Sequence, residues 1–144
     1  MKQTHHKIFV YGSLRSGFHH PAYHYISRYF TLVCNATVKG ILSDMGEFPA
    51  AVPTTDELFI KGELYTINNA DEFSWAIGQL DDYEGVNAEE EELPLFRREL
   101  ADVYMDNAEP AKAWVYWYNG NTDGKPLIAS GDVLEYFYNK NKNA

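Results

Sequence analysis

The sequence contains a single cysteine and no long apolar run, and each absence excludes a class of protein. Cys34 has no partner for an internal disulfide, which is typical of a protein kept in a reducing compartment. No apolar run reaches the roughly 20 residues that a membrane span needs, and no basic and then apolar leader precedes Ile8. We therefore expect a cytoplasmic protein with no membrane partner.

Positive charge is also scarce. The chain has 12 lysines and arginines against 21 aspartates and glutamates, and its formal net charge is -9. Such a field repels a phosphate backbone, so we expect no nucleic-acid partner. Part of the acidic excess is the glutamate run at residues 89–92, which is typical of a solvated loop.

The sequence does contain enough apolar material for one globular domain over residues 1–144. Hydrophobic residues make up 45% of the chain and aromatic residues 15%, as in folded proteins with a substantial core. Neither an internal repeat nor an interdomain linker is evident.

Local patterns predict several strands and few helices. The segment 7–11 (KIFVY) is apolar on both faces, which is typical of a central strand covered on both sides. Further strands are expected at 36–42, 58–67, 98–105 and 112–118, and helices from Pro21 and over about 71–84, with Asn69 or Asp71 as cap. These strands cannot all alternate with helices. The expected fold class is therefore α+β, with a mixed, barrel-like sheet and flanking helices.

The second predicted helix places a carboxylate on its apolar side. At 100° per residue, Phe73, Ile77 and Leu80 share one face, and Glu84 falls on the same face just before Gly85. Desolvation and the helix C-terminus would both raise the pKa of the Glu84 carboxyl, as a general base requires. Periodicity leaves a second interpretation open, in which the helix frays early and Glu84 reaches water.

The turn after the first strand is a candidate anion site. Successive backbone amides of Gly12, Ser13 and Leu14 can form a concavity that suits a carboxylate, a phosphate or a developing oxyanion. The turn lacks the lysine of a P-loop and the pattern of a hydrolase nucleophile elbow. A plain tight turn is the alternative.

Two further chemistries are disfavoured. His20 and His24 stand one helical turn apart, but no cysteine or carboxylate nearby completes a ligand set, so we expect surface histidines and no metal. Nothing around Cys34 would lower the pKa of its thiol, so it is not expected to be a nucleophile.

Seven motifs follow one another in an order that resembles a known family. They are FVYGSLRSG from residue 9, MGEFPAAVP at 45–53, KGELYTI at 61–67, LDDYEG at 80–85, FRREL at 96–100, AWVYWY at 113–118 and SGD at 130–132. In this order they resemble the γ-glutamylcyclotransferase-like superfamily, in particular its AIG2-like and YtfP-like bacterial branch. The resemblance covers nearly the whole chain.

The resemblance implies a fold, an activity and a site. The family folds as a small mixed barrel with flanking helices, and active members release 5-oxoproline from γ-glutamyl amines or peptides without metal or cofactor. It places the catalytic glutamate at Glu84 and backbone substrate binding at the turn formed by Tyr11, Gly12, Ser13 and Leu14. The family's arginine is Arg98, which we expect to pair with a protein carboxylate or to orient and bind substrate.

Two departures from the family pattern put the substrate in doubt. Phe96 stands where many relatives have tyrosine, and Val133 stands where a tryptophan is usual. The leading hypothesis is a cytoplasmic γ-glutamylamine-type cyclotransferase, a transferase or lyase, acting on a small molecule as a monomer or weak homodimer. A non-catalytic module that binds a small anionic metabolite is the alternative. A third hypothesis keeps the chemistry but places the γ-glutamyl group on a larger acceptor.

Overall fold

The computed structural model describes residues 6–11, 26–45, 49–84, 96–105, 109–128, 130–133 and 135–136, with Tyr83 and Glu84 described by their backbone alone. The strands in this part of the chain are β1 (Lys7–Val10), β2 (Phe30–Asp44), β3 (Pro49–Pro53), β4 (Phe59–Ile67), β5 (Phe96–Val103) and β6 (Ala111–Tyr118). A short 3-10 helix η2 (Ala70–Glu72) leads into the helix α2 (Phe73–Glu84), and residues 26–29 are also helical.

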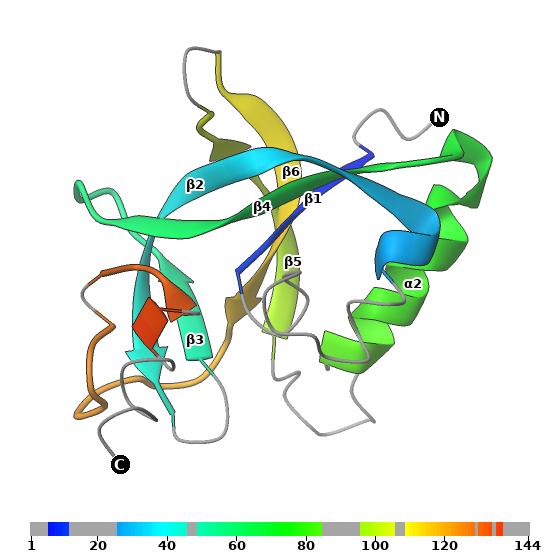
Figure 1. The fold of residues 1–144 in the computed structure, drawn as a ribbon. Helices are drawn as coiled ribbons and strands as arrows, with labels where there is room; N and C mark the ends of the chain where they lie inside the picture. The colour runs from blue at the N-terminus through cyan, green and yellow to red at the C-terminus, as the bar shows by residue number, and fades with distance from the viewer. Residues whose placement is uncertain are drawn as a thin grey trace.

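The strands form one mixed, strongly curled sheet in the order β3-β2-β4-β1-β6-β5 (Figure 1). β1 is antiparallel to β4 and parallel to β6, whereas the other pairs are antiparallel. Thr37 of β2 and Tyr104, just after β5, exchange two backbone hydrogen bonds of 3.0 and 2.8 Å, which brings the two sides of the curled sheet together. The predicted α+β class with a barrel-like sheet is confirmed.

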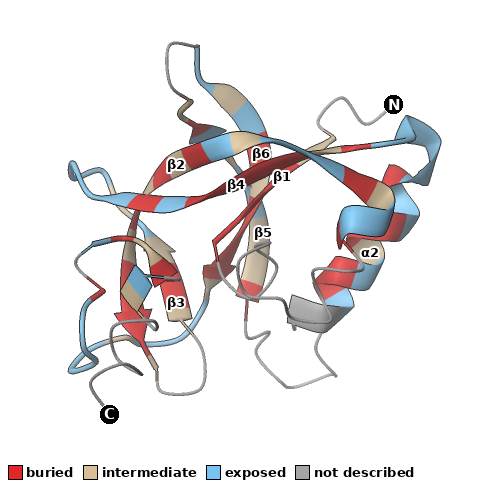
Figure 2. Cartoon of the chain, viewed as in Figure 1, coloured by how far each residue is buried: buried red, intermediate tan, exposed pale blue. Residues whose placement is uncertain are grey.

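The predicted central, doubly covered strand is confirmed in β1. Phe9 and Tyr11 belong to a core inside the curled sheet, the barrel core, with Val38, Leu64, Val115 and Trp117 among its members. Ile8 and Val10 point the other way into a second core, the helix-side core, with Phe30, Tyr65, Phe73 and Leu80. Figure 2 shows the resulting concentration of buried residues along β1 and β4.

The helix α2 covers the outer face of the sheet with the predicted residues. Phe73, Ala76, Ile77 and Leu80 are at most 5% exposed and lie in the helix-side core. The predicted capping by Asn69 is also observed, because its side chain accepts a hydrogen bond of 3.0 Å from the backbone N–H of Asp71. The apolar stripe therefore fixes which side of α2 meets the strands.

Two parts of the sheet differ from the sequence-based expectation. β2 spans Phe30–Asp44 rather than 36–42, and its register shifts between Leu32 and Cys34. β3 was not predicted as a strand, because a proline stands at each of its ends. β3 lies at the edge of the sheet, where a missing backbone N–H is tolerated.

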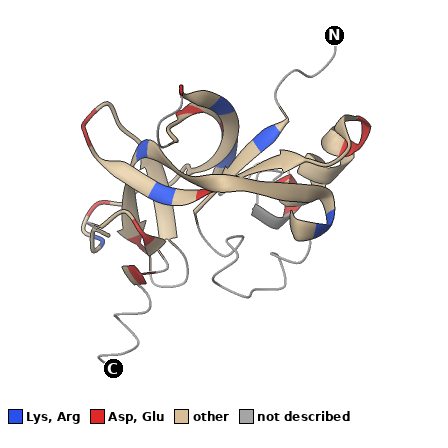
Figure 3. Ribbon diagram, turned by 45° about the horizontal axis from the view of Figure 1, so that its top comes forward, with Lys and Arg blue, Asp and Glu red and all other residues tan. Residues whose placement is uncertain are grey.

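The surface carries both signs of charge. Acidic and basic residues are dispersed over the described strands and helices rather than gathered on one face (Figure 3). Among the described helices, none has the length and apolarity needed to cross a membrane.

Alanine substitutions at two glycines, one beside β1 and one in α2 as a control, test how tightly β4 packs against β1. A Cβ added at Gly62 of β4 would lie 2.3 Å from the carbonyl oxygen of Val10, whereas one added at Gly78 of α2 would meet nothing within 4 Å. We expect Gly62→Ala to lower the free energy of unfolding by about 1–3 kcal/mol through overpacking. Gly78→Ala should instead raise it by roughly 0.5–1 kcal/mol, because alanine favours the helix. Urea unfolding of both variants checks this, and equal stabilities would contradict it.

Candidate active site

The end of β1 is tied to β6 by a tyrosine. Tyr11 is 7% exposed, and its hydroxyl donates a hydrogen bond of 2.6 Å to the backbone carbonyl of Tyr116. Tyr11 is the last described residue before the predicted turn at residues 12–14. The point from which that turn departs is therefore held by a buried hydrogen bond as well as by packing.

The last turn of α2 carries a buried carboxylate that the sequence analysis did not select. Asp81 is 8% exposed and accepts three hydrogen bonds. Its Oδ1 accepts from Arg98 Nε at 2.8 Å and from the Tyr116 hydroxyl at 2.8 Å, and its Oδ2 accepts from Arg98 Nη2 at 3.1 Å. The expected pairing of Arg98 with a protein carboxylate is confirmed, whereas its role in substrate binding stays a prediction.

Arg98 is held on two sides by the sheet and the helix. Its guanidinium carbon lies 4.4 Å from the ring centroid of Trp114, and its side chain is 20% exposed. The neighbouring Arg97 is 40% exposed and pairs with Glu99 at 2.8 Å. Alternation along β5 thus sends one arginine toward α2 and the other toward solvent.

Asp81 and Tyr116 have a weak signal in the sequence. Asp81 follows Ile77 by one helical turn, at the edge of the apolar face, and a lone aspartate there is equally compatible with solvent. The stronger signal is Arg98, because a cation on a strand beside apolar residues requires a carboxylate partner when it is buried.

Part of the predicted site lies outside the described residues. This applies to Gly12, Ser13 and Leu14, and to the side chain of Glu84, whose backbone ends α2. That these residues face one cavity with Tyr11 and Arg98 therefore remains a prediction. In the described portion of the chain, no group of three or more histidine, cysteine, aspartate or glutamate side chains could hold a metal ion.

The two residues that were expected to depart from the family pattern lie one in each core. Phe96 is 5% exposed in the helix-side core, and its ring centroid lies 5.6 Å from that of Tyr118. Val133 is 0% exposed in the barrel core. Both side chains therefore pack in apolar environments.

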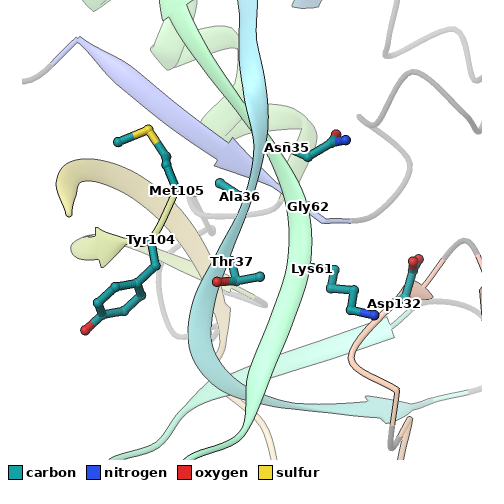
Figure 4. A pocket seen from close by; sticks show the side chains of 8 residues that line it. All are labelled: Asn35, Ala36, Thr37, Lys61, Gly62, Tyr104, Met105 and Asp132. Carbon is teal, nitrogen blue, oxygen red and sulfur yellow. The ribbon is translucent and has the colours of Figure 1, made fainter. Parts of the chain in front are cut away.

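A pocket of about 310 Å³ lies between β2, β4 and the segment that follows β5 (Figure 4). One of its lining residues, Gly62, packs closely against the Val10 carbonyl at the end of β1. In Figure 4 the Lys61 side chain extends from β4 toward the side on which Asp132 lies. The lining residues are Asn35, Ala36, Thr37, Lys61, Gly62, Tyr104, Met105 and Asp132.

The 130–132 motif is joined to this pocket through its glycine. The backbone N–H of Lys61 donates to the Gly131 carbonyl at 2.7 Å. Gly131 has a φ of 71°, and a Cβ there would lie 2.0 Å from the Phe59 carbonyl oxygen. The motif requires glycine at this position because the backbone is left-handed and pressed against β4.

Comparison of the sequence with known families identifies the same family that the seven motifs resemble. The family model described as "Gamma-glutamyl cyclotransferase, AIG2-like" matches residues 8–135. The chain belongs to this family. The γ-glutamylcyclotransferase family protein YtfP of Escherichia coli K12 is 30% identical over 130 residues, which cover 90% of this chain and 96% of that protein.

Solved structures share the fold. The solution NMR structure of E. coli ytfP has a TM-score of 0.60 and 29% identity, covering 91% of this chain and 98% of that one. The crystal structure of YkqA from Bacillus subtilis has a TM-score of 0.70 and 24% identity, covering 95% of this chain but 42% of that one. This chain therefore corresponds to less than half of YkqA. Family membership supports a cyclotransferase-like enzyme with a small-molecule substrate.

The two neighbouring arginines of β5 give a matched test of the buried ion pair. Arg98→Lys loses the two-pronged contact with Asp81 and the stacking on Trp114, so we expect the free energy of unfolding to fall by about 1–3 kcal/mol. Arg97→Lys alters a more exposed set of contacts, with Glu99, the Tyr118 carbonyl and Asn119, and should lower it by less, no more than about 1 kcal/mol. Urea unfolding measures both, and equal losses would show that burial adds nothing to the Arg98 contact.

Proposed function

We propose that the protein is a γ-glutamylcyclotransferase of the γ-glutamylamine type, which releases 5-oxoproline and an amine or amino acid. The observation that carries this proposal is the hydrogen-bonded connection from Tyr11 through Tyr116 to Asp81. It connects Tyr11, which precedes the predicted turn at residues 12–14, to the last turn of α2, which ends at Glu84, in a chain that belongs to the family.

The proposed reaction is an internal aminolysis. The substrate's α-ammonium must first lose a proton, and Glu84 would accept it as general base. The resulting amine attacks the γ-carbonyl carbon, so one C–N bond forms in the ring while the original amide C–N bond breaks. Glu84 would return the proton to the departing nitrogen. The new ring nitrogen loses a second proton as the lactam forms, and the released amine takes up this proton to leave as an ammonium, so that two protons pass from the attacking nitrogen to the departing one. Because attack is intramolecular, holding the folded conformer of the substrate supplies much of the acceleration.

The remaining predicted residues would bind and orient the substrate. The backbone amides of Gly12, Ser13 and Leu14 would hold the α-carboxylate or the tetrahedral oxyanion. Arg98 directs two of its five N–H donors to Asp81, which leaves others for a substrate oxygen. Proton transfer and backbone donors suffice for this reaction, so we propose neither a metal nor a cofactor.

The main alternative is a binding module of the same fold for a small anionic metabolite. Such a module would bind γ-glutamyl compounds without releasing 5-oxoproline. Incubating the purified protein with a panel of γ-glutamyl amines, γ-glutamyl amino acids and a γ-glutamyl group on a peptide distinguishes the two functions. Release of 5-oxoproline from the peptide alone would favour the third hypothesis, a larger acceptor.

Replacing Glu84 with glutamine tests the general base. The amide keeps the size of the side chain but cannot accept a proton at neutral pH, so kcat for 5-oxoproline release should fall by roughly 10²–10⁴-fold. If the Glu84 carboxyl is desolvated as the helical face predicts, the melting temperature should stay level or rise slightly, because the cost of burying a charge is removed.

Asp82→Asn is the matched control, because Asp82 is an exposed carboxylate in the same helical turn. Its kcat should remain within about twofold of the wild type, as expected for an exposed substitution outside the site. Equal kcat in the wild type and Glu84→Gln would end the catalytic assignment of Glu84.

The pocket at Lys61 offers a test of the leaving group. If the leaving group extends into this pocket, the Lys61 ammonium would attract a carboxylate carried by a departing amino acid. Lys61→Gln should then raise KM for a γ-glutamyl amino acid about tenfold, the equivalent of one charge-assisted hydrogen bond. KM for a γ-glutamyl amine without a carboxylate should not change. Equal effects on the two substrates would place the leaving group elsewhere.

A further inference from the structure

Asp81 is the last buried side chain of α2 that the structure describes, and both of its oxygens are engaged. The donors come from adjacent strands, because Arg98 of β5 and Tyr116 of β6 are partners in register. Arg98 is itself held against Trp114 of β6. The carboxylate therefore has its position and its orientation set by two strands of the sheet.

An ionic contact is an unusual means of merely attaching a helix. Replacing a buried ion pair with apolar residues of similar volume is often neutral or stabilising. The apolar residues of α2, from Phe73 to Leu80, already bury its face in the helix-side core. The Asp81 contacts add a directional constraint. Hydrogen bonds depend on distance and angle, so they fix the rotation of the last turn about the helix axis and its position along that axis, which apolar packing does not.

Asp81 lies where fixing the last turn of α2 also fixes the position of the Glu84 backbone. Residues three apart on a helix are neighbours on its surface, and Glu84 follows Asp81 by three positions. Tyr116, which donates to Asp81, also accepts from Tyr11 at the end of β1. The same network therefore connects the end of α2, where the proposed general base lies, with the end of β1, which precedes the proposed substrate-binding residues.

We propose that Asp81 is a positioning residue that holds the last turn of α2, and with it Glu84, in register with the end of β1. This inference rests on the proposed function. A general base must lie within hydrogen-bond reach of the proton that it removes, and displacement by about 1 Å can cost on the order of 10²-fold in rate. Loss of the Asp81 contacts should consequently lower kcat more than it raises KM.

The test is a double-mutant cycle with Asp81→Asn and Glu84→Gln, measured as 5-oxoproline release from a γ-glutamyl amine over long incubations. Asp81→Asn alone should lower kcat by about 10–10²-fold with KM within about threefold. In the Glu84→Gln background the same change should have little further effect, because Asp81 acts through Glu84. Asp82→Asn, the neighbouring exposed carboxylate, should leave kcat unchanged in both backgrounds.

Tyr116→Phe provides a milder variant that keeps the ring in the core and the carbonyl that accepts from Tyr11. It removes one hydrogen bond from Asp81 and should lower kcat by about threefold to tenfold without a matching change in KM. It decides the question if Asp81→Asn does not fold.

The outcomes separate the two proposals. Additive effects of Asp81→Asn and Glu84→Gln on kcat, or a wild-type kcat in both Asp81→Asn and Tyr116→Phe, would overturn the positioning role while the proposed function stands. Wild-type turnover by Glu84→Gln would remove Glu84 as general base and the positioning role with it. Absence of 5-oxoproline release by the wild-type protein across the panel would overturn both.

Discussion

The burial of β1 on both faces is the constraint on which the rest of the structure depends. Its side chains alternate between the barrel core and the helix-side core, so the strand must lie inside the sheet, between β4 and β6. The close approach of Gly62 to the Val10 carbonyl then fixes how β4 passes the end of β1. Tyr11 consequently emerges at a defined place, and a turn that follows it starts from a rigid base.

Directional polar contacts fix the orientation of α2, which apolar packing alone leaves less defined. Apolar burial holds α2 against the sheet but is insensitive to small rotations of the helix, because it is roughly proportional to area. The Asp81 carboxylate, shared by Arg98 and Tyr116, is sensitive to them. Tyr116 connects the helix to β1, since its hydroxyl donates to Asp81 of α2 and its backbone carbonyl accepts from the Tyr11 hydroxyl.

The elements that were predictable are those whose burial imposes a local period. The strands near 7–11, 58–67 and 112–118 and the apolar face of α2 follow from alternation and from the 3.6-residue repeat. The first half of β2 is largely exposed, and β3 is bounded by prolines, so neither shows such a period. The pairing of Arg98 with a carboxylate was expected, but its partner was not, because Asp81 lies at the margin of the helical face.

The sequence by itself determined the order of the family motifs, the apolar face of α2 from Phe73 to Leu80 and the two-sided character of β1, since each follows from residues that are close together in the chain. Only the tertiary structure decided that Asp81 meets Arg98, 17 positions away, and that Tyr11 meets Tyr116, 105 positions away. These contacts depend on the strand order β4-β1-β6-β5 and on the parallel pairing of β1 with β6. Strand order arises from the joint burial of both cores, a property of the whole chain that no local pattern contains.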